Sequence, residues 1–175
     1  MHTDLAPEVL SDAAWWKSGV YSSVFDWPLL LRAGPFQRSV EVPERGIKLI
    51  VEWEGEEPAW AAPIITALGE TLALPANWDS YSACRVNLEC VETAFEGLCS
   101  VMRSDTLSPT VVPTVHGGVQ LEWHARGIDL EIDISPTGRR YVSCVDRQGE
   151  TEWEGELSFN LGRLHEVMSR LSYHR

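Results

Sequence analysis

Residues 128–134 read Ile-Asp-Leu-Glu-Ile-Asp-Ile, a strict alternation of aliphatic and acidic side chains. Successive side chains of a β-strand point to opposite faces, so this period of two predicts a strand with one apolar face and one acidic face. Such a pattern is typical of an antiparallel sheet that packs one face on the core and turns the other to solvent.

The same period of two continues through the C-terminal part of the chain, and turn sequences separate the segments. Val111–Val115 is interrupted by Pro113, so we expect this strand at a sheet edge. Turns are expected at His116-Gly117-Gly118 and Pro136-Thr137-Gly138. The remaining alternating segments, which we expect to be strands, are Val119–Trp123, Tyr141–Val145 and Thr151–Leu157.

Helical periodicity dominates the middle of the chain. Apolar residues at steps of four after Pro58, beginning with Trp60 and Ile64, predict a helix that ends before Pro75. Other segments are expected as a short helix from Ser11 and Asp12 through Lys17, a hairpin of Arg38–Val42 with Ile47–Trp53, and helices at about Val86–Met102 and Leu161–Leu171.

Together these segments predict an α+β fold, an antiparallel meander sheet with three or four helices packed mainly on one face. The length of 175 residues favours a single domain over residues 1–175, in which residues 1–35 form a less regular N-terminal extension.

Acidic residues outnumber basic ones by 26 to 14, which gives a formal net charge of −12. This balance argues against direct binding of nucleic acid or anionic membranes, which requires clustered Lys and Arg, and it suits a basic protein partner. No targeting signal is visible, and the apolar stretches are too short to span a membrane, so we expect a cytoplasmic protein. The four cysteines, Cys84, Cys90, Cys99 and Cys144, are then expected to be free thiols.

The most distinctive segment, 74–83, lies between the two central helices and reads Leu-Pro-Ala-Asn-Trp-Asp-Ser-Tyr-Ser-Ala. It resembles a signature of small uncharacterised bacterial proteins, Asn-Trp-Asp-Ser-Tyr-Gly-Ala, followed downstream by a Gly-Gly-x-Gln-Leu-Glu-Trp strand. This chain carries the second motif at Gly117–Trp123, and the resemblance spans about residues 74–138. It supports the fold and implies no established activity. Ser82 stands where that signature has Gly, so a positive φ there would strain the backbone.

A second similarity, to barstar-type inhibitors, is confined to about residues 68–81 and suggests by analogy an acidic inhibitory surface. Two interpretations of the segment remain open. It forms a recognition loop with aromatic anchors, or it is a structural linker whose Asn and Asp satisfy backbone N–H groups while its aromatic residues fill the core. The candidate residues are Asn77, Trp78, Asp79 and Tyr81.

A second candidate site is the acidic side of the predicted strands. If these strands are neighbours, their carboxylates form a broad negative surface that would attract a basic partner, although a solvated outer face explains the same pattern. The candidate residues are Glu122, Asp129, Glu131, Asp133, Glu152, Glu154 and Glu156.

The chain contains no established catalytic motif, and its cysteines and histidines lack the spacing of metal ligands, so we expect no metal and no cofactor. The sequence therefore favours a non-enzymatic acidic protein-binding module, an antitoxin-like, immunity-like or defence-related inhibitor or adaptor. One alternative is a small hydrolase-like enzyme with its site near the Asn77–Tyr81 loop. Another is a structural subunit of a larger bacterial complex that uses aromatic residues such as Trp15, Trp16 and Trp27 as its interface.

Overall fold

The computed structural model describes residues 16–22, 36–53 and 56–173. Three α-helices and eight strands lie within these ranges. In chain order they are β1 (Trp16–Ser22), β2 (Phe36–Val42), the short 3-10 helix η1 (Pro43–Arg45), β3 (Ile47–Trp53), α1 (Ala61–Ala73), α2 (Leu88–Val101), β4 (Thr110–Pro113), β5 (Val119–Ala125), β6 (Ile128–Ile134), β7 (Arg140–Asp146), β8 (Thr151–Glu156) and α3 (Leu157–Leu171).

The strands form two antiparallel sheets, and the predicted α+β class with antiparallel pairing is therefore confirmed. The smaller sheet has the order β1-β3-β2, and the larger is the meander β4-β5-β6-β7-β8. The prediction of one sheet is wrong, because the hairpin of β2 and β3 pairs with β1 and not with the meander. Period-two alternation identifies strands but does not say which strands share hydrogen bonds.

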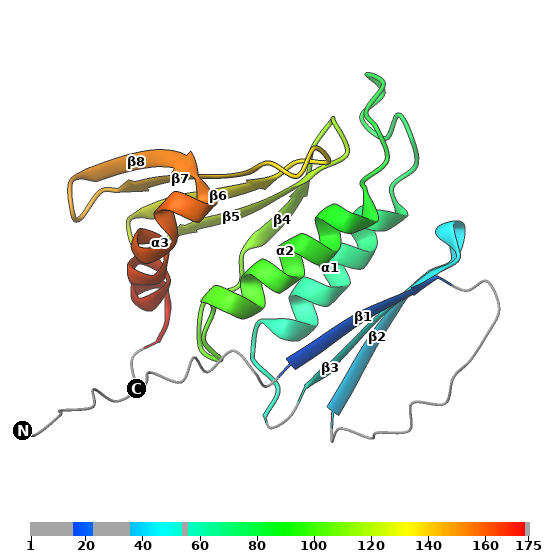
Figure 1. Ribbon diagram of the computed structural model, residues 1–175, viewed down its shortest axis with the longest axis horizontal. Coiled ribbons are helices and arrows are strands. Elements are labelled where there is room, and N and C mark those ends of the chain that lie inside the picture. The colour runs from blue at the N-terminus through cyan, green and yellow to red at the C-terminus, as the bar shows by residue number, and fades with distance from the viewer. Residues whose placement is uncertain (1–15, 23–35, 54–55, 174–175) are drawn as a thin grey trace, which may run out of the picture.

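Helices α1 and α2 lie between the two sheets, and α3 packs beside α2 under the larger sheet (Figure 1). Helix α1 contacts β2 and β4, α2 contacts β1, β5 and β6, and α3 contacts β7 and β8. Each sheet buries one set of alternating side chains against this layer, as in β3 and β6, whose residues alternate between buried and half-buried. One connected hydrophobic core thus includes residues from both sheets and all three α-helices.

The central helices begin and end where local sequence directs. The predicted stripe of α1, from Trp60 to Leu72, is buried along its length, and the helix ends two residues before Pro75. Helix α2 begins after Asn87, whose side-chain oxygen accepts a hydrogen bond from the backbone N–H of Glu89. Such N-caps satisfy one of the unpaired donors of the first turn.

Three details differ from the sequence-based expectations. The helix predicted through Lys17 is instead strand β1 from Trp16, and the rest of that prediction lies outside the described residues. Helix α3 begins at Leu157, four residues earlier than expected. Leu161 is 44% exposed and lies off the buried stripe of that helix.

No helix in the described ranges is long and apolar enough to cross a membrane.

Candidate binding surface on the larger sheet

The seven carboxylates singled out in the sequence lie on one side of the larger sheet. Strand register decides this, because each side chain shares its face with the residue paired across the ladder. Glu122 pairs with Glu131, which pairs with Ser143, which pairs with Glu154. The flanking rows place Asp133 beside Tyr141 and Glu156, and Asp129 beside Val145 and Glu152. We call this surface the acidic face: Glu122, Asp129, Glu131, Asp133, Glu152, Glu154 and Glu156.

The alternate residues of the same strands point the other way and are buried. Leu121, Trp123, Leu130 and Ile132 all belong to the hydrophobic core. The acidic residues of β5 and β6 are half-buried, and those of β8 are exposed. The predicted outward direction of the carboxylates is therefore what the structure has, and strands β5 to β8 are consecutive neighbours as the acidic surface requires.

Cations of the chain itself occupy the two ends of the acidic face. At one end, the His124 ring lies 3.0 Å from an Asp129 oxygen and 3.4 Å from a Glu122 oxygen, and Arg147 lies 2.6 Å from Asp129. At the other end, Arg139 Nε lies 3.2 Å from a Glu156 oxygen. These contacts are exposed enough that each ion pair contributes little to stability.

Three carboxylates of the acidic face have no cationic partner in the described residues. Within the described residues, no ion pair joins a cationic side chain to Glu131, Glu152 or Glu154. Glu131 accepts a hydrogen bond from the Gln120 amide at 3.0 Å, which is a neutral donor. Because like charges directly opposite destabilise a sheet, the facing Glu122 and Glu131 add to the cost of this arrangement.

The local environment shifts several pKa values on this face. Hydrogen bonds to Asp129 and then Glu122 raise the pKa of His124. The hydrogen bond from His124, and the nearby Arg147, lower the pKa of Asp129. Burial raises the pKa of Asp133, and nearby Glu122 adds to this shift while Arg139 opposes it. A cation from outside the chain would stabilise the charged form of such a carboxylate and lower its pKa.

The loop between α1 and α2 forms the second candidate site, and its polar side chains serve the loop itself. Asn77 Oδ1 accepts a hydrogen bond from the Ser82 N–H at 2.7 Å. Asp79 Oδ1 accepts from the N–H groups of Tyr81 and Ala83 at 2.8 and 3.0 Å. The Ala83 bond, followed by the Tyr81 bond, lowers the pKa of Asp79. The polar residues therefore act as the structural interpretation expected.

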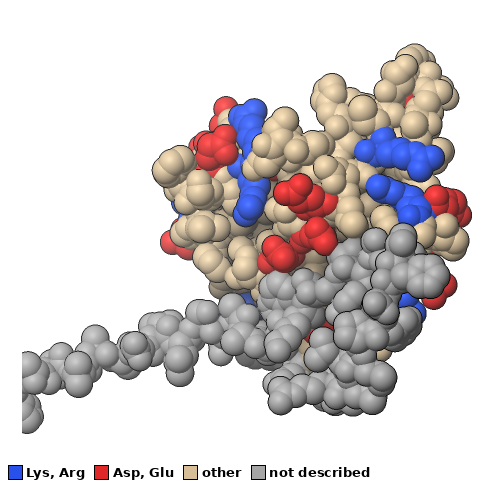
Figure 2. All heavy atoms as spheres, turned by 45° about the vertical axis from the view of Figure 1, so that its right-hand side comes forward, with Lys and Arg blue, Asp and Glu red and all other residues tan. Residues whose placement is uncertain are grey.

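The aromatic residues of this loop do not fill the core, contrary to the same interpretation. Tyr81 is 88% exposed. Trp78 is half-buried, and within the described residues its indole Nε1 is buried without a hydrogen-bond partner. The loop rises beyond the end of the helices in Figure 1, and its tip is nearly devoid of charged side chains in Figure 2. Trp16 lies in β1, whereas Trp15 and Trp27 fall outside the described residues.

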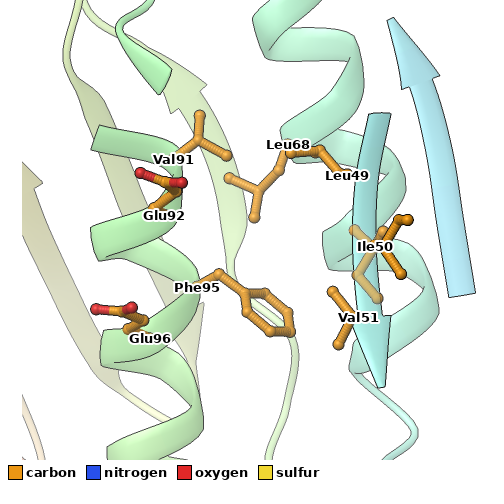
Figure 3. A pocket seen from close by; sticks show the side chains of 9 residues that line it. Leu49, Ile50, Val51, Leu68, Val91, Glu92, Phe95 and Glu96 are labelled. Carbon is orange, nitrogen blue, oxygen red and sulfur yellow. The ribbon is translucent and has the colours of Figure 1, made fainter. Parts of the chain in front are cut away.

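A small cavity lies between α2 and the smaller sheet (Figure 3). Its volume is about 80 Å³, and apolar side chains from β3 and α1 face Val91 and Phe95 of α2 across it. Glu92 and Glu96 stand at its rim, and burial, with neighbouring Glu96 and Glu89, raises the pKa of Glu92. The volume is well below the roughly 300–1,000 Å³ of pockets that enclose small-molecule substrates.

Metal and thiol chemistry find little support in the described ranges. No group of three or more His, Cys, Asp or Glu side chains is arranged there to hold a metal ion. All four cysteines are free thiols, of which Cys84 is exposed. Burial raises the pKa of Cys99 to about 12 and that of Cys144 to about 11, which disfavours the reactive thiolate at both positions.

Comparison with protein-family models, with curated proteins and with solved structures found no match to this chain.

Proposed function

We propose that this protein is a non-enzymatic binding module that recognises a basic protein through its acidic face. The observation that carries the proposal is the register of β5 to β8, which gathers seven carboxylates on one side of one sheet. A sheet needs an apolar inner face to fold, but it does not need seven carboxylates on its other face.

The distribution of charge on the acidic face favours binding of cationic side chains from a partner. The chain's own arginines lie at the ends of the face, while Glu131 and Glu154 in its central row have no cationic side chain paired to them in the described residues. Lys or Arg side chains of a partner would relieve the repulsion between these carboxylates. They would also speed association, because complementary charge steers two proteins together.

The class of function we favour is an antitoxin-like, immunity-like or defence-related inhibitor or adaptor in the cytoplasm. The net charge of −12 makes this chain electrostatically complementary to a basic target. The similarity to barstar-type inhibitors at residues 68–81 supports the same class by analogy. The hydrolase alternative has less support, since the Asp79 oxygen already accepts two backbone hydrogen bonds.

The test compares two variants with the same change in net charge. One reverses the three carboxylates of the acidic face that have no cationic partner in the described residues, Glu131→Lys, Glu152→Lys and Glu154→Lys. The matched control reverses three helical glutamates away from it, Glu70→Lys, Glu96→Lys and Glu166→Lys. None of these six carboxylates is in a described ion pair, so both variants should fold.

Both variants and the wild type serve as bait in lysate of the source cell, and a captured protein is then purified for stopped-flow association at several salt concentrations. We expect the face-reversed variant to associate at least about tenfold more slowly at low salt, with a flatter salt dependence. The helix-reversed control should retain most of the wild-type rate. Equal rates for the two variants would mean that the acidic face is only solvated surface.

A further inference from the structure

We infer that the acidic face receives a basic amphipathic α-helix of the partner, which lies along β7 between two rows of carboxylates. This inference rests on the proposed function and specifies what the partner presents. The observation behind it is that the carboxylates of the face are not evenly spread. They follow β5 and β6 on one side and β8 on the other, while β7 contributes none.

The outward-facing residues of β7 form an uncharged stripe between the two acidic rows. They are Tyr141, Ser143 and Val145, which pair with the acidic residues on both sides. Val145 is 38% exposed although it is a β-branched aliphatic residue that lies between Asp129 and Glu152. A partner surface with only charged side chains would bury no apolar area on this stripe. An apolar side chain placed on the stripe would be removed from water, which favours binding.

The dimensions of the stripe suit a helix. Strands are about 4.8 Å apart, so the row on β6 and the row on β8 are separated by about 10 Å. An α-helix with its side chains measures about 10–12 Å across, so flanking Lys or Arg could reach both rows. From Tyr141 to Val145 the strand rises about 14 Å, the length of about nine helical residues.

The chain's own Arg139 illustrates how a cation fits this surface. Its guanidinium lies 4.6 Å from the centroid of the Tyr141 ring and also pairs with Glu156. A cation on an aromatic face beside a carboxylate is a favourable arrangement. The central row, with Glu131 on one side of Ser143 and Glu154 on the other, offers two carboxylates where the described residues supply no such cation.

The probe is a synthetic 18-residue peptide in which Leu and Ala follow one helical face and Lys the flanks. A second peptide has the same composition in an order that abolishes the apolar face. Titration calorimetry with the full-length protein measures affinity, and circular dichroism measures helix formed on binding. We expect the amphipathic peptide to bind at least about tenfold more tightly than the reordered one, because only it can place an apolar face on β7.

Val145→Glu separates this inference from simple charge attraction. It removes the apolar side chain and adds a negative charge, so attraction alone predicts tighter binding, whereas a helix seated on β7 predicts about tenfold weaker binding of the amphipathic peptide. Val145→Gln, which adds no charge, should also weaken binding of the amphipathic peptide. Ser158→Glu is the control, since it adds one charge at an exposed position in the first turn of α3. Thermal melts verify that every variant is folded.

The outcomes distinguish the two proposals. Weaker binding by both Val145 variants, with helix induction in the amphipathic peptide, supports a helix on β7. Equal affinity for the two peptides, or tighter binding by Val145→Glu, overturns the helix while leaving a basic partner on the acidic face. Failure of both Lys-rich peptides to bind overturns the helix as well. If the face-reversed variant then also associates with the captured partner at the wild-type rate, the proposed function fails with it.

Discussion

Ser82 adopts a backbone conformation that glycine adopts more easily, with φ at 76°. Asn77 and Ser80 in the same loop also have positive φ values, of 61° and 66°. Side-chain and backbone hydrogen bonds hold this turn closed, including the one from the Ser82 N–H to Asn77. The strain expected at Ser82 if its backbone were left-handed is therefore present, and the loop's own hydrogen bonds oppose it.

Replacing Ser82 with glycine should stabilise the protein. Relief of the left-handed strain gains about 1–2 kcal/mol, and the greater freedom of glycine in the unfolded chain offsets part of it, for a net gain of about 0.5–1 kcal/mol. The backbone N–H that donates to Asn77 is kept. Urea denaturation measures the gain, and Ser108→Gly, at an exposed position without a positive φ, should instead lower stability. A loss of stability in Ser82→Gly would mean that the hydroxyl matters more than the strain.

Asp146 gives the protein a predictable response to acid. It is buried and accepts two hydrogen bonds from Arg170 and one each from the N–H groups of Gln148 and Gly149. The Arg170 bond, then the Gly149 bond, lowers the pKa of Asp146 well below its usual range. A carboxylate with a lowered pKa stabilises the fold above its unfolded pKa, and this contribution is lost as the pH falls toward the folded pKa.

Asp146→Asn should therefore be less stable than the wild type at pH 7, and the difference should shrink as the pH falls below about 4. Melting temperatures from pH 7 to pH 3 measure this difference. Glu166→Gln, at an exposed site on α3, should follow the wild type throughout. A constant gap between Asp146→Asn and the wild type over this range would show that the ionised pair with Arg170 is not its cause.

At the scale of elements, α1 approaches the smaller sheet closely at Gly69. A Cβ atom placed there would lie 2.4 Å from Cγ1 of Val40 in β2. Glycine is a poor helix former, so its place in the middle of α1 is explained by this contact and not by local preference. Gly97 of α2 is different, because a Cβ there would meet no atom within 4 Å.

Gly69→Ala and Gly97→Ala should accordingly have opposite effects. The first forces Val40 to move and should cost about 1–3 kcal/mol despite the better helix propensity of alanine. The second should stabilise the protein by about 0.5–1 kcal/mol. Chemical denaturation of both variants tests this, and Val40→Ala combined with Gly69→Ala should cost less than the sum of the two single changes. Equal effects of the two alanines would show that α1 is not held against β2 in this way.

At the scale of the whole molecule, α1 and α2 connect the two sheets into one core. Trp60, the N-cap residue of α1, and Phe95 of α2 lie with ring centroids 6.2 Å apart inside this layer. Both sheets pack on the same helices, so unfolding of one sheet would expose the helices on which the other sheet depends. The single domain predicted from chain length should therefore unfold as one unit.

We expect one cooperative transition in guanidinium chloride. Far-ultraviolet circular dichroism, which reports on helices and strands, and tryptophan fluorescence, which reports on side-chain packing, should give the same midpoint. Leu68→Ala in the shared layer, at a fully buried position, should lower the free energy of unfolding by about 2–5 kcal/mol. Both curves should then shift together to lower denaturant concentration. Two separated transitions would mean that the sheets are independent units.

Local sequence determined most of the elements and the faces they bury. The alternation of Ile128–Ile134 and the four-residue steps from Trp60 to Leu72 each specify an amphipathic element, and the buried side is the predicted one. The outward direction of the seven carboxylates follows from the same alternation. These features depend on residues close together in the chain, which is why the sequence alone suffices for them.

Tertiary structure decided which elements meet. Strand β1 begins at Trp16, where the sequence suggested the end of a short helix, and its pairing with β3 is a long-range contact that no local period specifies. Tyr81 is exposed because its loop closes on its own backbone through Asn77 and Asp79, although its residue type suits a core. The uncharged stripe on β7 between two acidic rows exists only because β6, β7 and β8 pair in this order and register. Pairing order is set by the packing of the whole chain, and alternation within a strand does not encode its neighbours.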